Sequence, residues 1–142
     1  MRFIAMTEDQ AKWVAYQWKY KGAYSFFHDK DQPDVQMFLE VGKKNTRQYA
    51  AYEKDEIIGF IGVKLKEKTL EIAPGLNPEL IGKGRGKEFL ESCISFLHEE
   101  TLEQLHVYIS KENQRAINVF EDVGFMQSSA NEQQRIQMQY RY

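Results

Sequence analysis

The chain has 142 residues, of which 42% are hydrophobic, and a formal net charge of −2. This length and composition fit one globular domain over residues 1–142, and the weak negative charge gives no reason to expect nucleic acid or an anionic membrane as a partner. No apolar run reaches the roughly 20 residues of a membrane helix, and the single cysteine cannot form an internal disulfide, so we expect a cytoplasmic protein without a membrane partner.

The amino-terminal part predicts a strand followed by two helices. Residues 2–6 form the strand, and Thr7 with Gln10 makes a capping box for a helix that runs to about residue 19. Apolar residues between 35 and 41 form the second helix, which ends near Gly42.

Residues 20–34, between these helices, form a loop rich in aromatic and acidic side chains. The aromatic rings either pack into the core or line a substrate pocket, and the sequence leaves both interpretations open. The aspartates suit a cationic acceptor through charge and cation–π attraction, but they equally suit solubility. These side chains are Tyr24, Phe26, Phe27, His28, Asp29, Asp31 and Asp34.

Three strands are predicted next. Residues 48–52 and 57–65 form a hairpin around the turn at 53–56, and residues 69–73 form the third strand. The third strand runs into Pro74-Gly75, a pair that breaks regular pairing and favours a bulge or a splay.

A glycine-rich loop then leads into a helix. Gly82, Gly84 and Gly86 can take backbone angles that point successive amide N–H groups at one anion, and the first turn of the helix, opening near residues 84–87, adds unpaired N–H groups. The loop therefore predicts a phosphate or pyrophosphate site, with a plain connection carrying solvated charges as the alternative. Three basic residues alternate with the glycines: Lys83, Arg85 and Lys87.

The remaining chain predicts a helix, a strand, a second helix and a last strand. Apolar residues at helical spacing over 89–97 include Cys93, which we therefore expect in the core rather than as a nucleophile. Residues 105–109 alternate as a strand, and residues 113–124 form a helix with an asparagine N-cap and a glycine C-cap. The alternating run at 136–140 is the last strand.

Two of these segments together resemble the motifs of the GNAT superfamily of acyl-CoA-dependent N-acetyltransferases. Residues 81–86 are similar to the pyrophosphate loop (Gln/Arg)-x-x-Gly-x-(Gly/Ala), from which Ile81 departs at the first position. Residues 113–125 are similar to the segment Asn-x-x-Ala-hydrophobic-x-hydrophobic-Tyr-x-x-x-Gly-Phe, with Phe120 in place of the tyrosine. One helix and one strand separate the two motifs, as in the family.

The resemblance implies an α/β fold of the α+β type, with a mixed, mostly antiparallel central sheet, splayed strands and flanking helices. It also implies acetyl-CoA as the acyl donor and no metal ion. The implied cofactor-binding residues are Leu76, Gly82, Lys83, Gly84, Arg85, Gly86, Lys87, Asn113, Ala116 and Phe120.

The same resemblance implies direct attack of a primary amine on the thioester in a ternary complex. Glu71 is the candidate base, or else a solvent-facing strand carboxylate, and the Leu76 N–H is the candidate group that polarises the carbonyl. Phe120 has no proton to give, so Tyr108 or water protonates the CoA thiolate, or the thiolate leaves unassisted.

Two other function classes compete with this reading. A non-catalytic acyl-CoA-binding sensor or interaction module of the same fold is the alternative, because the usual tyrosine is missing. A nucleic-acid module built on residues 83–87 is disfavoured, because the positive charge is local and no aromatic strand platform accompanies it. The sequence does not identify the acceptor beyond a small-molecule or peptide amine. It also leaves the oligomeric state open, and a homodimer is one option.

Overall fold

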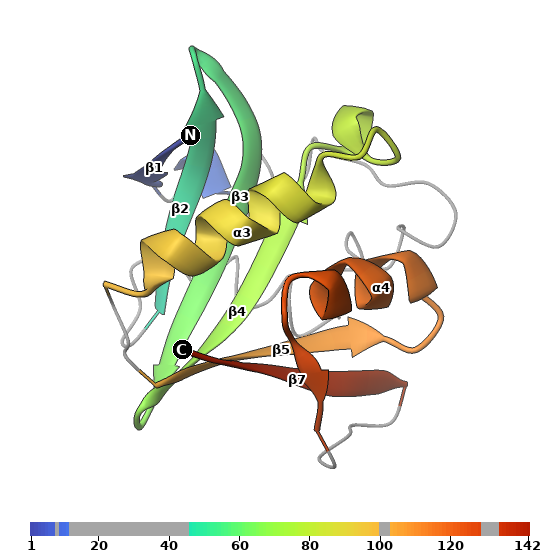
Figure 1. Cartoon of the computed structure of the whole chain (residues 1–142). Helices are drawn as coiled ribbons and strands as arrows, with labels where there is room; N and C mark the ends of the chain where they lie inside the picture. Colours follow the sequence, from blue (N-terminus) through green and yellow to red (C-terminus); the bar gives the residue numbers. More distant parts are fainter. Residues whose placement is uncertain (8, 12–45, 100–102, 129–133) are drawn as a thin grey trace.

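A computed structural model describes residues 1–7, 9–11, 46–99, 103–128 and 134–142 (Figure 1). The strands form one seven-stranded sheet in the order β1-β2-β3-β4-β5-β7-β6. They are β1 (Arg2–Ala5), β2 (Thr46–Glu53), β3 (Glu56–Lys66), β4 (Thr69–Leu76), β5 (Gln104–Ser110), β6 (Met126–Gln127) and β7 (Arg135–Arg141). The helices are the 3₁₀ turn η2 (Pro78–Leu80), α3 (Gly86–Leu97) and α4 (Gln114–Asp122).

The predicted fold class is confirmed. Every strand pair of the sheet is antiparallel except β4 with β5, and helices flank the sheet. The predicted strands are each found with ends shifted by a few residues, and the short strand β6 is added. Among the described residues, no helix combines the length and apolar character needed to cross a bilayer.

The amino-terminal helix begins as predicted. The Thr7 N–H donates to the Gln10 side chain at 3.0 Å, and the Gln10 N–H donates to the Thr7 hydroxyl at 3.2 Å, which is the reciprocal capping box. The remainder of this helix, the predicted helix at 35–42 and the aromatic loop at 20–34 lie outside the described residues.

The parallel pair β4 and β5 separates part of the way along. Its register runs from Thr69 opposite Gln104 to Ile72 opposite Val107 and then stops, and Figure 1 shows the two strands diverging beyond this point. We call the point just after Ile72 and Val107 the fork. The predicted splay is therefore confirmed.

Pro74-Gly75 lies in the splayed part of β4 and makes no bulge. The register of β3 with β4 continues without a shift through Ile61 opposite Pro74. Since the Asn77 N–H donates to the Ile58 carbonyl at 2.8 Å, alternation turns the backbone of Asn77 towards β3 and that of Pro74 towards β5. Proline thus sits where the neighbouring strand has left, and its missing N–H removes no bond from the ladder.

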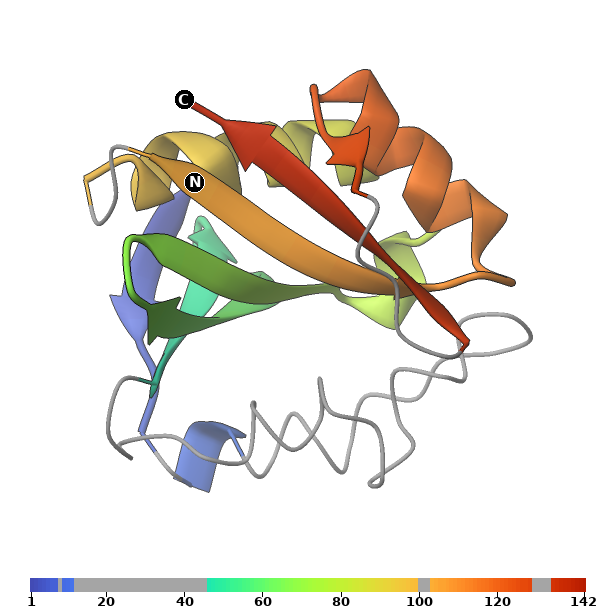
Figure 2. The ribbon, with the colours of Figure 1, turned by 90° about the horizontal axis from the view of Figure 1, so that it is seen from below.

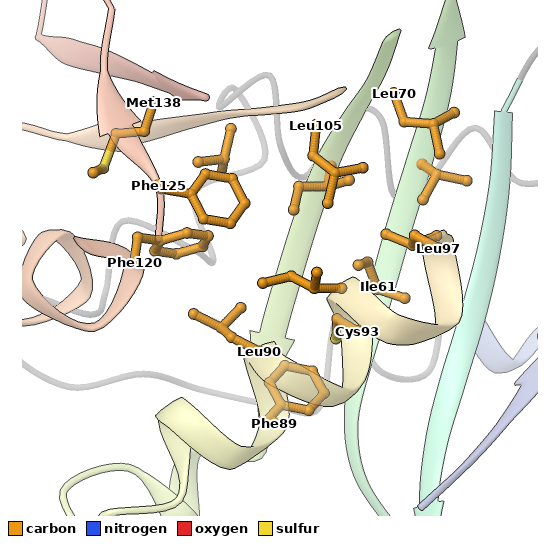
Figure 3. Close-up of a cluster of buried hydrophobic side chains, with 14 of the residues drawn as sticks. Ile61, Leu70, Phe89, Leu90, Cys93, Leu97, Leu105, Phe120, Phe125 and Met138 are labelled. Atoms are coloured by element: carbon orange, nitrogen blue, oxygen red, sulfur yellow. The ribbon is translucent and has the colours of Figure 1, made fainter. Parts of the chain in front are cut away.

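Helices α3 and α4 cover the same face of the sheet (Figure 2). The core lies between them and the strands, and the buried side chains of α3 point into it (Figure 3). Cys93 is among them, and its burial raises the pKa of the thiol, so the prediction of an inert core cysteine is confirmed. Core members shown in Figure 3 include Ile61, Leu70, Phe89, Leu90, Leu97, Leu105, Phe120, Phe125 and Met138.

The opposite side of the sheet, which we call the second face, is more polar around β4 and β5. Because Leu70 and Ile72 point into the core, Glu71 between them points to the second face. By the same alternation Leu105 and Val107 place His106 and Tyr108 on the second face. The fork therefore lies between a helix-covered face and a face that carries titratable side chains.

Candidate functional site

A pocket of about 330 Å³ opens between the end of β4, the glycine-rich loop and helices α3 and α4. This volume falls in the range of roughly 300–1,000 Å³ that small-molecule sites occupy. Most of its wall is apolar, and the loop and the start of α4 supply the polar part. The residues that line it are Pro74, Gly75, Leu76, Ile81, Gly82, Gly84, Gly86, Lys87, Phe89, Leu90, Asn113, Arg115, Ala116, Val119, Phe120 and Asp122.

The three glycines of the loop line this pocket, and two of them take backbone angles that favour glycine. Gly82 and Gly84 have φ angles of 85° and 74°, the left-handed region that residues with a Cβ avoid. Gly86 needs no such angle, because it is the first residue of α3. A Cβ there would lie 3.5 Å from Val119 Cγ1, an ordinary van der Waals distance, so this position faces α4 without requiring a glycine for packing. Two left-handed glycines followed by a helix start are a backbone arrangement that suits an anion.

Only one of the three basic residues of the loop lines the pocket. Lys87 lines the pocket, whereas Lys83 and Arg85 are not among the lining residues. Arg85 instead pairs with Glu53 of β2, Nη2 to Oε2 at 2.6 Å, and with Glu88 at 3.4 Å. The Arg85 side chain therefore fastens the loop to the β2–β3 hairpin, and a phosphate role would require it to leave both carboxylates.

Arg115 is a pocket residue that the sequence did not indicate. It lies in the first turn of α4, and a Cβ built on Gly82 would come within 3.3 Å of its Nη1 atom. The guanidinium thus brings a positive charge to the glycine-rich loop from the other helix. Its place two residues after the Asn113 N-cap was the available signal, but only the fold brings α4 and the loop together.

Asn113 lines the pocket and has a side-chain donor without a partner among the described residues. Only 1% of the residue is exposed, and its Oδ1 accepts a hydrogen bond from the Ala116 N–H at 3.2 Å, capping α4. The Nδ2 atom is buried without a hydrogen-bond partner in the described part of the chain. Leaving a buried donor unpaired costs about 1–3 kcal/mol, so a ligand with an acceptor oxygen would recover this energy.

Ala116 and Phe120, on the same face of α4, form an apolar wall of the pocket. Phe120 is also held in the core, where its ring stands edge-on to that of Phe125 at a centroid distance of 5.0 Å. The ring has no polar atom, so this wall contributes shape and apolar contact only.

Beyond the fork, backbone groups of β4 and β5 face each other. Alternation from the Asn77 bond to β3 turns the peptide groups of Leu76 towards β5. The Lys111 N–H donates to the Gln134 carbonyl at 2.9 Å, so the same reasoning turns those of Tyr108 and Ser110 towards β4. An extended ligand lying in the fork would therefore meet main-chain donors and acceptors from both strands.

The three predicted catalytic residues do not lie together. Leu76 lines the pocket, while Glu71 and Tyr108 are on the second face, across the fork from it. Glu71 pairs with Lys66 Nζ at 2.7 Å. The Tyr108 hydroxyl accepts a hydrogen bond from Gln137 Nε2 at 2.9 Å, and the Arg135 guanidinium lies 4.8 Å from its ring centroid.

Comparison with known sequences points to one family. The profile of the Acetyltransferase (GNAT) domain matches residues 2–126. The mycothiol acetyltransferase of Renibacterium salmoninarum is 24% identical over 145 residues, which cover 92% of this chain. The match covers 41% of that protein, so this chain spans well under half of the relative's length.

Solved structures share the fold. The spermidine N-acetyltransferase of Vibrio cholerae, in complex with CoA and spermine, superposes with a TM-score of 0.74 at 14% identity, covering 99% of this chain and 94% of its own. An N-acetyltransferase of Campylobacter jejuni superposes with a TM-score of 0.71 at 18% identity, covering 99% and 96%. At these identities the likeness shows the fold alone.

Proposed function

Since the chain belongs to the GNAT acetyltransferase family, we propose that it transfers an acetyl group from acetyl-CoA to a primary amine by direct attack in a ternary complex. The observation that supports this most is the buried, unpartnered Asn113 Nδ2 in a pocket that also holds the left-handed Gly82 and Gly84. An extended ligand with a pyrophosphate at one end and amide carbonyls along its length satisfies both features.

Acetyl-CoA would be held by groups at each end of the pocket. The amides of the glycine-rich loop and of the first turn of α3, with the Lys87 ammonium, suit the pyrophosphate. The Asn113 amide suits a carbonyl of the pantetheine arm, and the backbone of β4 and β5 beyond the fork suits its peptide-like groups. Ala116 and Phe120 give the arm an apolar wall.

The chemical step needs an unprotonated amine, a polarised carbonyl and a leaving thiolate. In our proposal the Leu76 N–H donates to the thioester oxygen as negative charge develops on it. Glu71, on the second face, supplies a negative charge that favours loss of the proton from the amine. Tyr108 or water protonates the thiolate, whose conjugate thiol has an ordinary pKa of about 8.5 and so needs little assistance.

The acceptor is proposed only as a class. The solved and curated relatives are named for spermidine, spermine and mycothiol, and a primary amine, of a small molecule or a peptide, is the acceptor we propose for this chain. The single domain and its cytoplasmic setting likewise remain proposals, in line with the charge and cysteine usage of the sequence.

Isothermal titration with CoA tests the donor site first. We expect saturable binding at low ionic strength, and a chain that binds no CoA at millimolar concentration would remove the proposal. A panel of acceptors, namely spermidine, an aminoglycoside, free amino acids and a lysine-containing peptide, then tests turnover. The competing function is a CoA-binding sensor, which is favoured because Phe120 has no hydroxyl proton to donate to the CoA thiolate. Steady release of free CoA with any amine would exclude it.

The two cations nearest the helix start should respond differently to mutation. Lys87→Ala should weaken CoA binding about fivefold, as expected when one exposed charge near a phosphate is lost, and the difference should shrink in high salt. Arg85→Ala should leave CoA affinity nearly unchanged, because its guanidinium is engaged by Glu53 and Glu88. Titrations of both variants at two salt concentrations measure this. A larger loss in Arg85→Ala than in Lys87→Ala would contradict it.

A further inference from the structure

Two titratable side chains stand next to each other where the sheet divides. Glu71 of β4 and His106 of β5 are register partners, one pair before the last, Ile72 with Val107. Both project to the second face, away from α3 and α4, and partner residues in neighbouring strands are about 4.8 Å apart along the ladder. Glu71 and His106 are thus placed side by side at the fork.

The imidazole of His106 is prepared to accept a proton. Its Nε2 atom is buried and has no hydrogen-bond partner among the described residues. Burial lowers the pKa of His106 below its ordinary value, which keeps the ring neutral at pH 7 and leaves one ring nitrogen as an acceptor. Glu71 acts in the opposite direction and raises that pKa, whereas Lys66 lowers it. Desolvation is the largest of these influences, so the net shift of the His106 pKa is downward.

The described charged and polar side chains near His106 come from β3, β5 and β7 as well as from β4. From β3, Lys66 reaches Glu71 at 2.7 Å and Lys64 is the register partner of Glu71. From β7, the neutral Gln139 is the register partner of His106. Tyr108 follows on the same face of β5, and the charges at the two ends of β7 belong to Arg135 and Arg141. Glu71 is therefore the carboxylate nearest in register to His106.

The ion pair with Lys66 argues against Glu71 acting alone. Its carboxylate already has an ammonium 2.7 Å away, and only 19% of its side chain is exposed. A carboxylate in this arrangement is better placed to stabilise a neighbouring positive charge than to leave its partner and reach the amine. His106 supplies the nitrogen that can carry that positive charge.

We propose that His106 takes the proton of the acceptor amine, directly or through one water, and that Glu71 is the positioning residue that stabilises the resulting imidazolium. This rests on the proposed acetyl transfer. As the amine nitrogen bonds to the thioester carbon, the carbon–sulfur bond breaks and CoA leaves as thiolate. The nitrogen loses its proton to Nε2, and the imidazolium returns that proton to solvent or to the thiolate, which restores the neutral ring.

The pH profile of kcat/KM, measured with the most active amine of the panel, tests this. In the wild type an acidic limb should follow the deprotonation of His106, located independently by NMR titration of the imidazole. Glu71→Gln should move both the limb and the NMR transition to lower pH, because it removes the charge that raises the pKa. Lys66→Met should move both to higher pH for the opposite reason.

His106→Asn should lower kcat about a hundredfold, abolish this limb and leave the dissociation constant of CoA unchanged. His98→Asn is the matched control, because His98 caps the end of α3, on the helix-covered side of the sheet, and stacks on Tyr142 with ring centroids 4.3 Å apart. That variant should keep the wild-type profile.

Three results would overturn the role of His106. They are an unchanged limb in a folded His106→Asn protein, a Glu71→Gln protein that loses activity with its limb in place, and a wild-type imidazole still protonated at pH 7. The NMR titration uses the unmodified chain and decides the question even if His106→Asn fails to fold. Failure of CoA to bind the wild type would instead remove the proposed function itself.

Discussion

Replacing Gly84 by valine should weaken CoA binding roughly a hundredfold, the loss expected when two charge-assisted hydrogen bonds of about 1.5 kcal/mol each are broken. Gly84 has a φ of 74°, which a β-branched residue does not hold, so the loop would turn its amides away from the anion. The fold should survive, because a Cβ at this position meets no atom of the described residues within 4 Å beyond its chain neighbours, and the strain of about 1–2 kcal/mol falls on an exposed loop.

Gly84→Asn is the matched control for the backbone angle. Asparagine is close to valine in size but enters the left-handed region more readily, so this variant should keep most of the affinity. Circular dichroism checks the fold of both proteins and isothermal titration measures CoA binding. A folded Gly84→Val protein that binds CoA as tightly as the parent would show that the loop is only a connection between β4 and α3.

Asn113→Ser should weaken CoA binding about tenfold while the protein stays nearly as stable as the parent. Serine is also a good N-cap, so its oxygen can still accept from the first turn of α4, but the unpartnered amide donor is gone. The loss corresponds to one hydrogen bond in a buried site, where water does not replace it easily.

Asn113→Ala separates the two duties of this side chain. It should lose the same CoA affinity as Asn113→Ser and, in addition, about 1 kcal/mol of stability, because the N-cap is lost as well. Denaturant unfolding and CoA titration of the two variants provide the comparison. If both variants bound CoA like the parent, Nδ2 would have no part in the donor site, and the main support for the pocket assignment would fall.

The sequence predicted those parts of the site that are local in the chain. The glycine spacing, the start of α3 and the Asn113 cap each depend on residues within a few positions of one another, and hydrophobic periodicity was enough to place their elements. The splay followed from Pro74-Gly75 in the same way. Gly86 lines the pocket, but it is the first residue of α3 and does not take the left-handed backbone angle of Gly82 and Gly84.

What the sequence missed depends on contacts between distant segments. Arg85 pairs with Glu53, 32 residues earlier, and is not among the pocket residues. No local sequence pattern predicts that partner. Arg115 reaches the glycine-rich loop only because α4 packs beside α3. The pairing of His106 with Glu71 depends on the register between β4 and β5. Helix α3 separates these strands in the chain, so neither strand alone predicts the pairing.

Because β4 and β5 separate at the fork, fewer residue pairs join them than join β3 to β4. Four residue pairs join β4 to β5, whereas eight join β3 to β4, so the strand pairing between the half with β1–β4 and the half with β5–β7 is short. A donor molecule bound between the two strands would bridge both halves, and binding to the native state alone raises stability by mass action. Amide hydrogen exchange along the ends of β4 and β5 should therefore slow together when CoA is added, which makes the cohesion of the sheet a readout of donor occupancy.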